Sequence, residues 1–354
     1  MPVLQIKPRS ECRWDSVSLG EVLLRFDPGD ERIHSTRSFR VFEGGGEYNV
    51  ARNLNTVFGC STAVVTALAD NPLGRLAEGL IKQAGVDPSE IVWREVDGIS
   101  GNTRNGIYYI ERGFGLRNPV GCSDRGNTAV SQLKPGDIDW RRIFSDLGTR
   151  GFHTGGVFTG LSDTTPKVAL QAMQAAKESG SVVSYDLNYR DSLWKTRGGR
   201  EAANKLNYEL LPYADVVFGA DNFAASVAAY DENQFRRAAE TVMSKFPNLK
   251  VVVSTLRTVH SASRHDLGAV CFAEGNVHKC QDLTGLEVLD RVGSGDAFAA
   301  GFMYGLLNGD EPIVSLDYGL ANAAFALTSL GDASSATLEE VRHAMHQGER
   351  TVSR

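Results

Sequence analysis

The sequence predicts an α/β protein in which helices cover both faces of a doubly wound, mostly parallel sheet. Apolar strand-like runs alternate with helical segments along the chain, as at 166–179 and 181–186. This alternation is typical of parallel sheets, because each strand returns through a helix that packs on the sheet. Two stretches, at about 30–45 and 100–125, are strand-like, polar and spaced by glycines, with no helix within them. They predict a small β-sheet lid.

The individual elements follow from residue periodicity and from the residues that begin and end helices. Val50, Leu54 and Val57 share one helical face, and Pro72 and Gly85 are typical of the start and the end of a helix. The expected elements are, in order, strand 16–26, helix 48–58, strand 61–68, the helix from Pro72 to Gly85, helix 166–179, strands 181–186 and 215–219, helix 232–246, strand 250–255, a hairpin at 268–273 and 276–280, and helices 296–307 and 312–330. A capping box at 337–340 precedes a last helix.

Length, charge and cysteine usage narrow the classes of protein to which the chain can belong. Its 354 residues carry a formal net charge of -6, with 37 basic and 43 acidic side chains, so general nucleic-acid binding is a poor expectation. The five cysteines are scattered and form no C-x-x-C pair, which indicates reduced thiols. No signal peptide or membrane-length apolar run is visible. We expect a cytoplasmic protein with one domain at 16–347 and tails at 1–15 and 348–354.

A glycine-rich turn before an expected helix is the most informative stretch. The segment 290–301 reads DRVGSGDAFAAG, so Gly293, Ser294 and Gly295 precede a helix that begins near Asp296. Backbone N–H groups in such a turn, together with the positive end of the helix dipole, can bind a phosphate. Asp296 beside it is a candidate general base for a hydroxyl nucleophile. The residues alone leave a second interpretation open, in which Asp296 only caps the helix.

A second glycine cluster lies between the first lid segment and a helix. It reads EGGGEYNVA at 43–51. Consecutive glycines let a ligand approach the backbone closely, and Asn49 offers a hydrogen-bond donor and an acceptor to a polyhydroxylated ligand. A flexible hinge followed by an ordinary asparagine explains the same residues, so this cluster does not decide by itself.

The two motifs together resemble the signatures of the PfkB, or ribokinase-like, carbohydrate kinases. The turn is similar to D-T-x-G-A-G-D, and the first cluster is similar to G-G-x-x-x-N-x-A. The resemblance extends from about 16 to about 346 and implies a ribokinase-like fold with ATP and Mg²⁺ as cofactors. It implies an anion hole at Gly293, Ser294 and Gly295, Asp296 as catalytic base, and sugar contacts at Gly45, Gly46 and Asn49. Arg291 stands where threonine is common, which leaves the family's monovalent-cation site uncertain.

The substrate class depends on Arg190. The segment Asp186-Leu-Asn-Tyr-Arg190 follows an expected strand, and ligands of open α/β sheets bind beyond the carboxyl ends of strands. An arginine there can pair bidentately with a carboxylate. The D-x-N-x-R pattern resembles that of 2-keto-3-deoxygluconate kinases, whereas ribokinases and fructokinases often share only the Asp-x-Asn part. The alternative is that Arg190 forms a salt bridge with Asp186 or Asp191 to shape the loop.

Further segments resemble the same subgroup. Ser254-Thr-Leu-Arg257 with 261–263 is similar to its T-L-R…S-A-S stretch, and 106–109 with 123–125 is similar to its lid. The resemblance implies that Tyr108 contacts the substrate, although plain packing explains this tyrosine equally well. Arg125 is a candidate for a second carboxylate partner.

The nucleotide side follows the family pattern less closely. The resemblance implies nucleotide contacts from Thr255, Arg257, Gly293, Gly295 and Asn322, while a buried Asn322 without a ligand remains an alternative. The family's N-x-x-E metal motif is absent at 220–223, where Asp221 and Asn222 are weak substitutes. ATP phosphates carry too much charge for backbone groups alone, so Mg²⁺ is still expected.

The sequence therefore predicts a kinase for a sugar acid. Asp296 takes the proton from the 6-hydroxyl of 2-keto-3-deoxygluconate, and the product is 2-keto-3-deoxy-6-phosphogluconate. The lid excludes water, and the resemblance makes a homodimer through the lid plausible, with no nucleic-acid or membrane partner. A kinase for a neutral sugar such as fructose or ribose, and a non-catalytic sugar- or nucleotide-binding relative, stay open.

Overall fold

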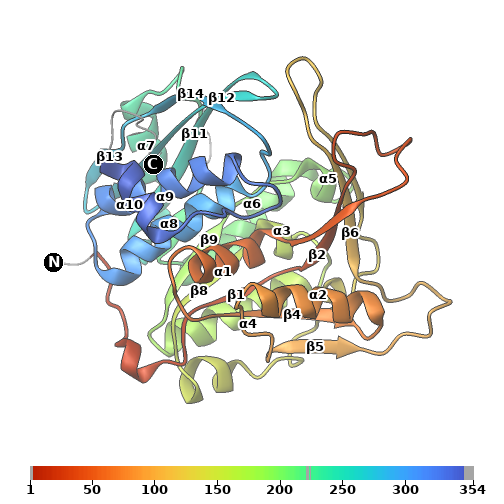
Figure 1. The fold of residues 1–354 in the computed structure, drawn as a ribbon. Coiled ribbons are helices and arrows are strands. Elements are labelled where there is room, and N and C mark those ends of the chain that lie inside the picture. The colour runs from red at the N-terminus through yellow and green to blue at the C-terminus, as the bar shows by residue number, and fades with distance from the viewer. Residues whose placement is uncertain (1–2, 221–222, 224, 347–354) are drawn as a thin grey trace.

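The computed structural model describes residues 3–220, 223 and 225–346, which form one large sheet between helices and a smaller sheet beside it (Figure 1). The strands of the large sheet are β1 (Trp14–Leu19), β4 (Thr62–Ala69), β5 (Ile91–Arg94), β8 (Thr149–Gly155), β9 (Val182–Asp186), β10 (Val216–Phe218), β11 (Val251–Ser261), β12 (Arg264–Ala273), β13 (Asn276–Lys279) and β14 (Leu283–Glu287). The strands of the smaller sheet are β2 (Leu23–Asp27), β3 (Arg40–Gly44), β6 (Gly106–Glu111) and β7 (Val120–Asp124).

The α-helices lie between these strands along the chain. They are α1 (Gly46–Thr56), α2 (Pro72–Gln83), α3 (Gly156–Thr159), α4 (Thr165–Glu178), α5 (Asp191–Trp194), α6 (Gly199–Leu210), α7 (Glu232–Lys245), α8 (Ser294–Asn308), α9 (Pro312–Leu327) and α10 (Leu338–His346). Short 3-10 turns occur at Arg9–Glu11, Val130–Gln132 and Leu211–Tyr213, and a π-helical turn at Arg142–Asp146. Thr337 and Glu340 form the predicted capping box of α10, with reciprocal bonds of 2.7 Å and 3.3 Å to each other's backbone N–H groups.

The large sheet has the topology that the alternating sequence pattern predicts. Its order is β13-β12-β11-β10-β9-β8-β1-β4-β5, with β14 paired to β12. The pairs from β11 to β5 are parallel, and β12, β13 and β14 add an antiparallel edge. Apolar side chains of α4, α6 and α7 cover one face, and those of α1, α2, α8 and α9 cover the other. The α/β class is therefore confirmed. No helix among the described residues has the length and apolar composition needed to cross a membrane.

The smaller sheet confirms the predicted β-sheet lid, with one strand more than expected. Its order is β3-β2-β6-β7, and β2 and β6 rise along one side of the molecule (Figure 1). The single strand expected at 16–26 is in fact β1 in the large sheet and β2 in the lid. The chain bends between them at Gly20, where a Cβ atom would lie 2.4 Å from a side-chain oxygen of Glu47.

The N-terminal segment also differs from the prediction. Residues 1–15 were expected to form a tail; among those that the structure describes, Leu4 is buried against the core that includes α8 and α9. β1 already begins at Trp14. Apolar burial of Leu4 contributes roughly 1.5–3 kcal/mol, and hydrogen bonds between Lys7 and the backbone of Phe144 and between Arg150 and the backbone of Lys7 also hold the segment. The predicted C-terminal tail lies outside the described residues.

Candidate active site

A cavity of about 650 Å³ lies beyond the carboxyl ends of β1, β8 and β9 and beneath the lid. Parallel strands end there together, so their following loops converge on one place. The lid contributes side chains from β2, β6 and β7 to its wall. The residues that line it include almost every predicted site residue: Gly45, Gly46, Asn49, Tyr108, Arg190, Thr255, Arg257, Gly293, Ser294, Gly295 and Asp296.

The turn at the start of α8 has the geometry of an anion site. Gly293 is the N-cap with φ 77, and its Cβ would lie 1.9 Å from the backbone oxygen of Asp332. Only glycine tolerates both the positive φ and the close approach of this oxygen. The first N–H groups of α8 have no acceptor within the helix, and the helix dipole adds positive potential. A Cβ atom on Gly295 meets nothing within 4 Å, so this side of the turn is open to a ligand.

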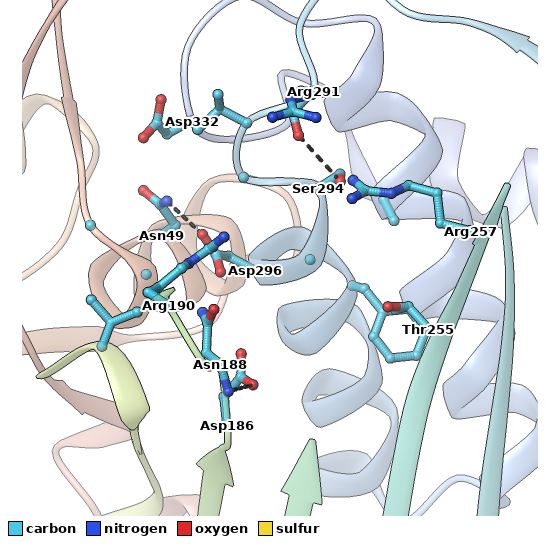
Figure 2. Close-up of a pocket in the computed structure, with 18 of the residues that line it drawn as sticks. Asn49, Asp186, Asn188, Arg190, Thr255, Arg257, Arg291, Ser294, Asp296 and Asp332 are labelled. Atoms are coloured by element: carbon cyan, nitrogen blue, oxygen red, sulfur yellow. Dashed lines mark hydrogen bonds between the residues drawn. The ribbon is translucent and has the colours of Figure 1, made fainter. Parts of the chain in front are cut away.

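Asp296 does not act as the cap of α8, because Gly293 holds that position. Its carboxylate instead accepts a hydrogen bond of 2.7 Å from the side-chain amide of Asn49 on α1 (Figure 2). The two glycine motifs, which are far apart in the sequence, thus meet at this contact. The geometry favours the interpretation of Asp296 as a proton acceptor over that of a capping residue.

The electrostatic surroundings of Asp296 favour proton uptake. Desolvation raises the pKa of Asp296 well above its ordinary value, and the charges of Asp186 and Asp332 act in the same direction. The hydrogen bond from Asn49 and the charge of Arg190 oppose this rise. Burial also raises the pKa of Asp186, to about 6. A carboxyl group with a raised pKa is a stronger base once it is ionised, which suits general-base chemistry near neutral pH.

Arg190 is free to bind a ligand. The backbone N–H of Asn188 donates to Asp186 (3.0 Å), and this bond shapes the loop that carries Arg190. Arg190 is exposed and forms no ion pair or side-chain hydrogen bond with any described residue. Its guanidinium group points toward Asp296 (Figure 2). The alternative salt bridge with Asp186 or Asp191 is therefore not formed.

The lid places two further polar side chains against the cavity, and both already have partners. Tyr108 donates its hydroxyl to the carboxylate of Asp332, and burial raises its pKa. Arg125 forms an ion pair with the buried Glu21. A second substrate carboxylate would compete with Glu21 for Arg125, so Arg190 is the better candidate for an acid group.

The side of the cavity next to β11 suits an anionic ligand. Thr255 and Arg257 project from β11 and Arg291 from the turn, and the two guanidinium groups lie near Ser294 (Figure 2). Neither arginine has an ion-pair partner among the described residues, and desolvation, Arg291 and Arg190 lower the pKa of Arg257. Uncompensated positive charge beside an amide-lined turn fits a polyphosphate. In the sequence, Arg291 is visible only as a departure from a motif, and its place in the cavity wall was not predicted.

The prediction for Asn322 is not supported. Its side chain is fully buried between α8 and α9, where its amide donates to the backbone oxygen of Ala297 (2.8 Å). It does not line the cavity. The side-chain amide N–H group of Asn322 is thus used within the helix packing, while its Oδ1 has no hydrogen-bond partner among the described residues. The nucleotide contact of Asn322 stays a prediction.

The metal ligands remain a proposal. The candidates Asp221 and Asn222 lie outside the described residues. Within the described part of the chain, no group of three or more His, Cys, Asp or Glu side chains is arranged to hold a metal ion.

Comparisons with known proteins agree with this geometry. Residues 15–339 match the family model described as pfkB family carbohydrate kinase. A 2-dehydro-3-deoxygalactonokinase from Haloferax volcanii is 31% identical over 96% of this chain and 98% of its own length. A crystal structure of 2-dehydro-3-deoxygluconokinase from Thermotoga maritima superimposes with a TM-score of 0.84 and 31% identity, covering 94% of this chain and 99% of that one. A PfkB family carbohydrate kinase from Listeria grayi has a TM-score of 0.82 and 27% identity, over 93% and 99% of the two chains.

The family match covers most of the chain, and it spans both the Asn49 and the Asp296 motif. The anion-binding turn, the adjacent carboxylate with a raised pKa and the lid are arranged around one cavity, as phosphoryl transfer to a sugar requires. The protein belongs to the PfkB family of carbohydrate kinases.

Proposed function

We propose that the chain transfers the γ-phosphoryl group of ATP to the 6-hydroxyl of 2-keto-3-deoxygluconate and forms 2-keto-3-deoxy-6-phosphogluconate and ADP. The observation that carries this substrate class is Arg190, an arginine that lines the cavity and has no ion-pair partner among the described residues. Two relatives at 31% identity are named as kinases for 2-dehydro-3-deoxy sugar acids. A free guanidinium group in a sugar site is best explained by a carboxylate on the substrate.

Asp296 is the proposed general base. It accepts the proton of the 6-hydroxyl as the oxygen bonds to phosphorus and the bond from phosphorus to the ADP oxygen breaks. Asn49 holds the carboxylate in place through the 2.7 Å hydrogen bond. The N–H groups at Gly293, Ser294 and Gly295 stabilise the charge on the transferring group. Gly45, Gly46 and Tyr108 line the sugar side of the cavity.

ATP and Mg²⁺ are the proposed cofactors. Thr255, Arg257 and the turn form the wall that would hold the nucleotide, and their charge and openness fit a polyphosphate. Mg²⁺ neutralises phosphate charge when it is bound. Asp221 and Asn222 stay as proposed ligands, and we assign no monovalent cation.

The names of the relatives point to two epimers of the sugar acid as substrates. The Haloferax relative is named for the galacto compound and the Thermotoga structure for the gluco compound. These two acids differ only in configuration at C4, and both carry the carboxylate that Arg190 suits. The galacto epimer is therefore the second candidate substrate.

The outer face of the lid supports the proposed homodimer. Phe26, Phe39 and Tyr109 form an aromatic cluster there, with ring centroids 5.4–5.9 Å apart, and Val41 beside it is exposed. Pairing of two lids would bury this cluster. We expect the protein to be cytoplasmic, as its reduced cysteines favour, and to elute as a dimer. Tyr109→Arg should shift the mass measured by light scattering toward that of the monomer.

A coupled ADP-release assay tests the proposed function. The panel contains 2-keto-3-deoxygluconate, its galacto epimer, fructose, ribose and gluconate. Turnover of either keto-deoxy acid at a kcat/KM at least about tenfold above the neutral sugars supports the proposal. Preference for fructose or ribose would replace it by the neutral-sugar alternative, and no turnover with any compound would favour a non-catalytic binding protein.

A further inference from the structure

A fully buried arginine of the lid lies directly behind the phosphoryl-binding turn. Arg25 is on β2, and its side chain has no exposed surface. It donates to Asp27 (2.9 Å), to Asp332 (2.8 Å) and to Asp290. Neither the motifs nor the relatives' names assign this group a role. Arginine is almost never buried unless its charge is paired, so the cluster is a built feature of the fold.

Two of these carboxylates hold the turn itself. Asp290 begins the turn segment, and its other oxygen accepts the backbone N–H of Val292 (3.1 Å). The backbone oxygen of Asp332 packs against Gly293 so closely that any Cβ there would overlap it. A single guanidinium group thus connects the segment that precedes the anion site with the segment that packs on it.

The lid enters the same network at a second point. Tyr108, which lies next to Arg25 in the pairing of β2 with β6, donates its hydroxyl to Asp332. Asp332 therefore receives one bond from each of two lid strands. Buried side chains thus hold the lid and the turn in a fixed position relative to each other.

Charge in this cluster depends on Arg25. Desolvation raises the pKa of Asp290, while the charge of Arg25 lowers it again. Desolvation opposes the charge of Arg25 itself, but Asp332 and Asp290 raise its pKa above the ordinary value. Without the guanidinium group, two buried carboxylates would face each other unpaired. They would take up protons or separate, and either change moves the turn.

We propose that Arg25 is a positioning residue, which fixes the phosphoryl-binding turn through Asp290 and Asp332 and couples it to the lid. This inference rests on the proposed function for the meaning of the turn, but not on the identity of the sugar. Arg25 does not reach the cavity and does not touch the substrate. It acts by keeping the N–H groups of the turn in the place where charge develops.

The test compares Arg25→Met, the charge-matched double variant Arg25→Met/Asp290→Asn and a control, Arg150→Met. Arg150 is also largely buried and ion-paired, to Asp15 (2.8 Å), but at the opposite, amino ends of β1 and β8. Each variant is measured for melting temperature, for kcat and KM, and for binding of inorganic tripolyphosphate by calorimetry. The double variant removes one charge of each sign. It should therefore restore the melting temperature if unpaired buried charge is the only cause of the loss in Arg25→Met.

A positioning role predicts different outcomes for stability and for turnover. Arg25→Met should lower kcat by about 100-fold, the loss expected for a displacement of about 1 Å, and should weaken tripolyphosphate binding about tenfold. The double variant should recover the melting temperature but not kcat. Added guanidinium ion should restore part of the kcat of Arg25→Met. Arg150→Met should lose melting temperature only.

A purely structural role predicts the opposite pattern. Recovery of both kcat and melting temperature in the double variant would overturn the proposal, as would Arg25→Met with wild-type kcat. If Arg25→Met fails to fold, the double variant alone decides. Absence of kinase activity in the wild type would refute the proposed function, and tripolyphosphate binding would then still test whether Arg25 holds the turn.

Discussion

Replacing Arg190 by methionine removes the only feature of the cavity that we assign to the substrate carboxylate. Methionine keeps an unbranched, flexible side chain that fills most of the space of the aliphatic part, and it deletes the charge. Because Arg190 has no ion-pair partner among the described residues, the change leaves none of them with an unpaired charge. We therefore expect the variant to fold and melt like the wild type and to differ only in what it binds.

The size of the effect follows from the bonds that the guanidinium group can make. A charge-assisted hydrogen bond contributes roughly 1.5–3 kcal/mol, and a bidentate pair makes two. Arg190 is exposed, so water screens part of this energy, and we take a net loss of about 2–3 kcal/mol. This corresponds to a fall of about 30- to 150-fold in kcat/KM for 2-keto-3-deoxygluconate, mainly through KM. The KM for ATP should stay within about twofold.

The assay must separate binding from the pH effect of the same substitution. Arg190 lowers the pKa of Asp296, so Arg190→Met shifts the acidic limb of the pH profile to higher pH. Coupled ADP release is therefore measured from pH 5 to 9, and the plateaus are compared. Arg200→Met is the matched control, because Arg200 lies over the ring of Tyr189 outside the cavity. An unchanged plateau KM for the acid would refute the assignment of Arg190.

Three further predictions concern the base and the turn. Asp296→Asn should lower kcat by about 10²- to 10⁴-fold, and a wild-type rate would contradict its role as base. The melting temperature should not fall, because the raised pKa of Asp296 means that the folded state disfavours its charge. Asp186→Asn removes a neighbouring negative charge, so the pKa of Asp296 should fall and the acidic limb of kcat/KM should move to lower pH; a shift to higher pH would contradict this sign. Gly293→Ala should reduce both melting temperature and kcat, because its Cβ overlaps the backbone of Asp332, whereas Gly295→Ala should fold normally and lose phosphoryl transfer only; equal melting temperatures would count against the steric argument.

Local sequence signals predicted the parts of the site that depend on backbone geometry. Gly293 to Gly295 and Asp296 were identifiable as candidates because a glycine turn at a helix start can bind a phosphate, although the residues alone left open that Asp296 only caps the helix. The alternation of strands and helices likewise predicted the parallel sheet, and with it the edge where the loops converge. The family resemblance assigned Asn49 and Asp296 to one site but did not predict their hydrogen bond, since the two motifs lie on different helices.

Other features depend on tertiary contacts that no local pattern reveals. Arg25 stands between Leu24 and Phe26 in an apolar strand, and a charge there is usually expected to face solvent. Its three carboxylate partners come from two distant segments and its own strand, so their meeting was not visible. Asn322 is the reverse case: the resemblance implied a nucleotide contact, whereas its amide donates to the backbone oxygen of Ala297 within the helix packing. One weak signal existed for Arg25, because a charge that is buried among apolar residues requires a partner, and Asp27 stands two residues later in the same strand.

The local field of the cavity differs from the net charge of the chain, and this difference leads to a last prediction. The protein carries a formal net charge of -6, yet the proposed reaction brings together two anions, ATP and a sugar acid. Arg190, Arg257 and Arg291 line the cavity without ion-pair partners among the described residues, and they offset this repulsion locally.

Such steering is screened by salt, because the Debye length falls from about 10 Å at 0.1 M to about 3 Å at 1 M. We expect kcat/KM for both substrates to fall as sodium chloride is raised, with kcat nearly constant. Arg257→Met and Arg291→Met should flatten the salt dependence for ATP more than that for the acid, and Arg190→Met the reverse. If all three variants keep the wild-type slope for both substrates, the guanidinium groups do not attract the anions, and the division of the cavity into a nucleotide side and an acid side loses its electrostatic basis.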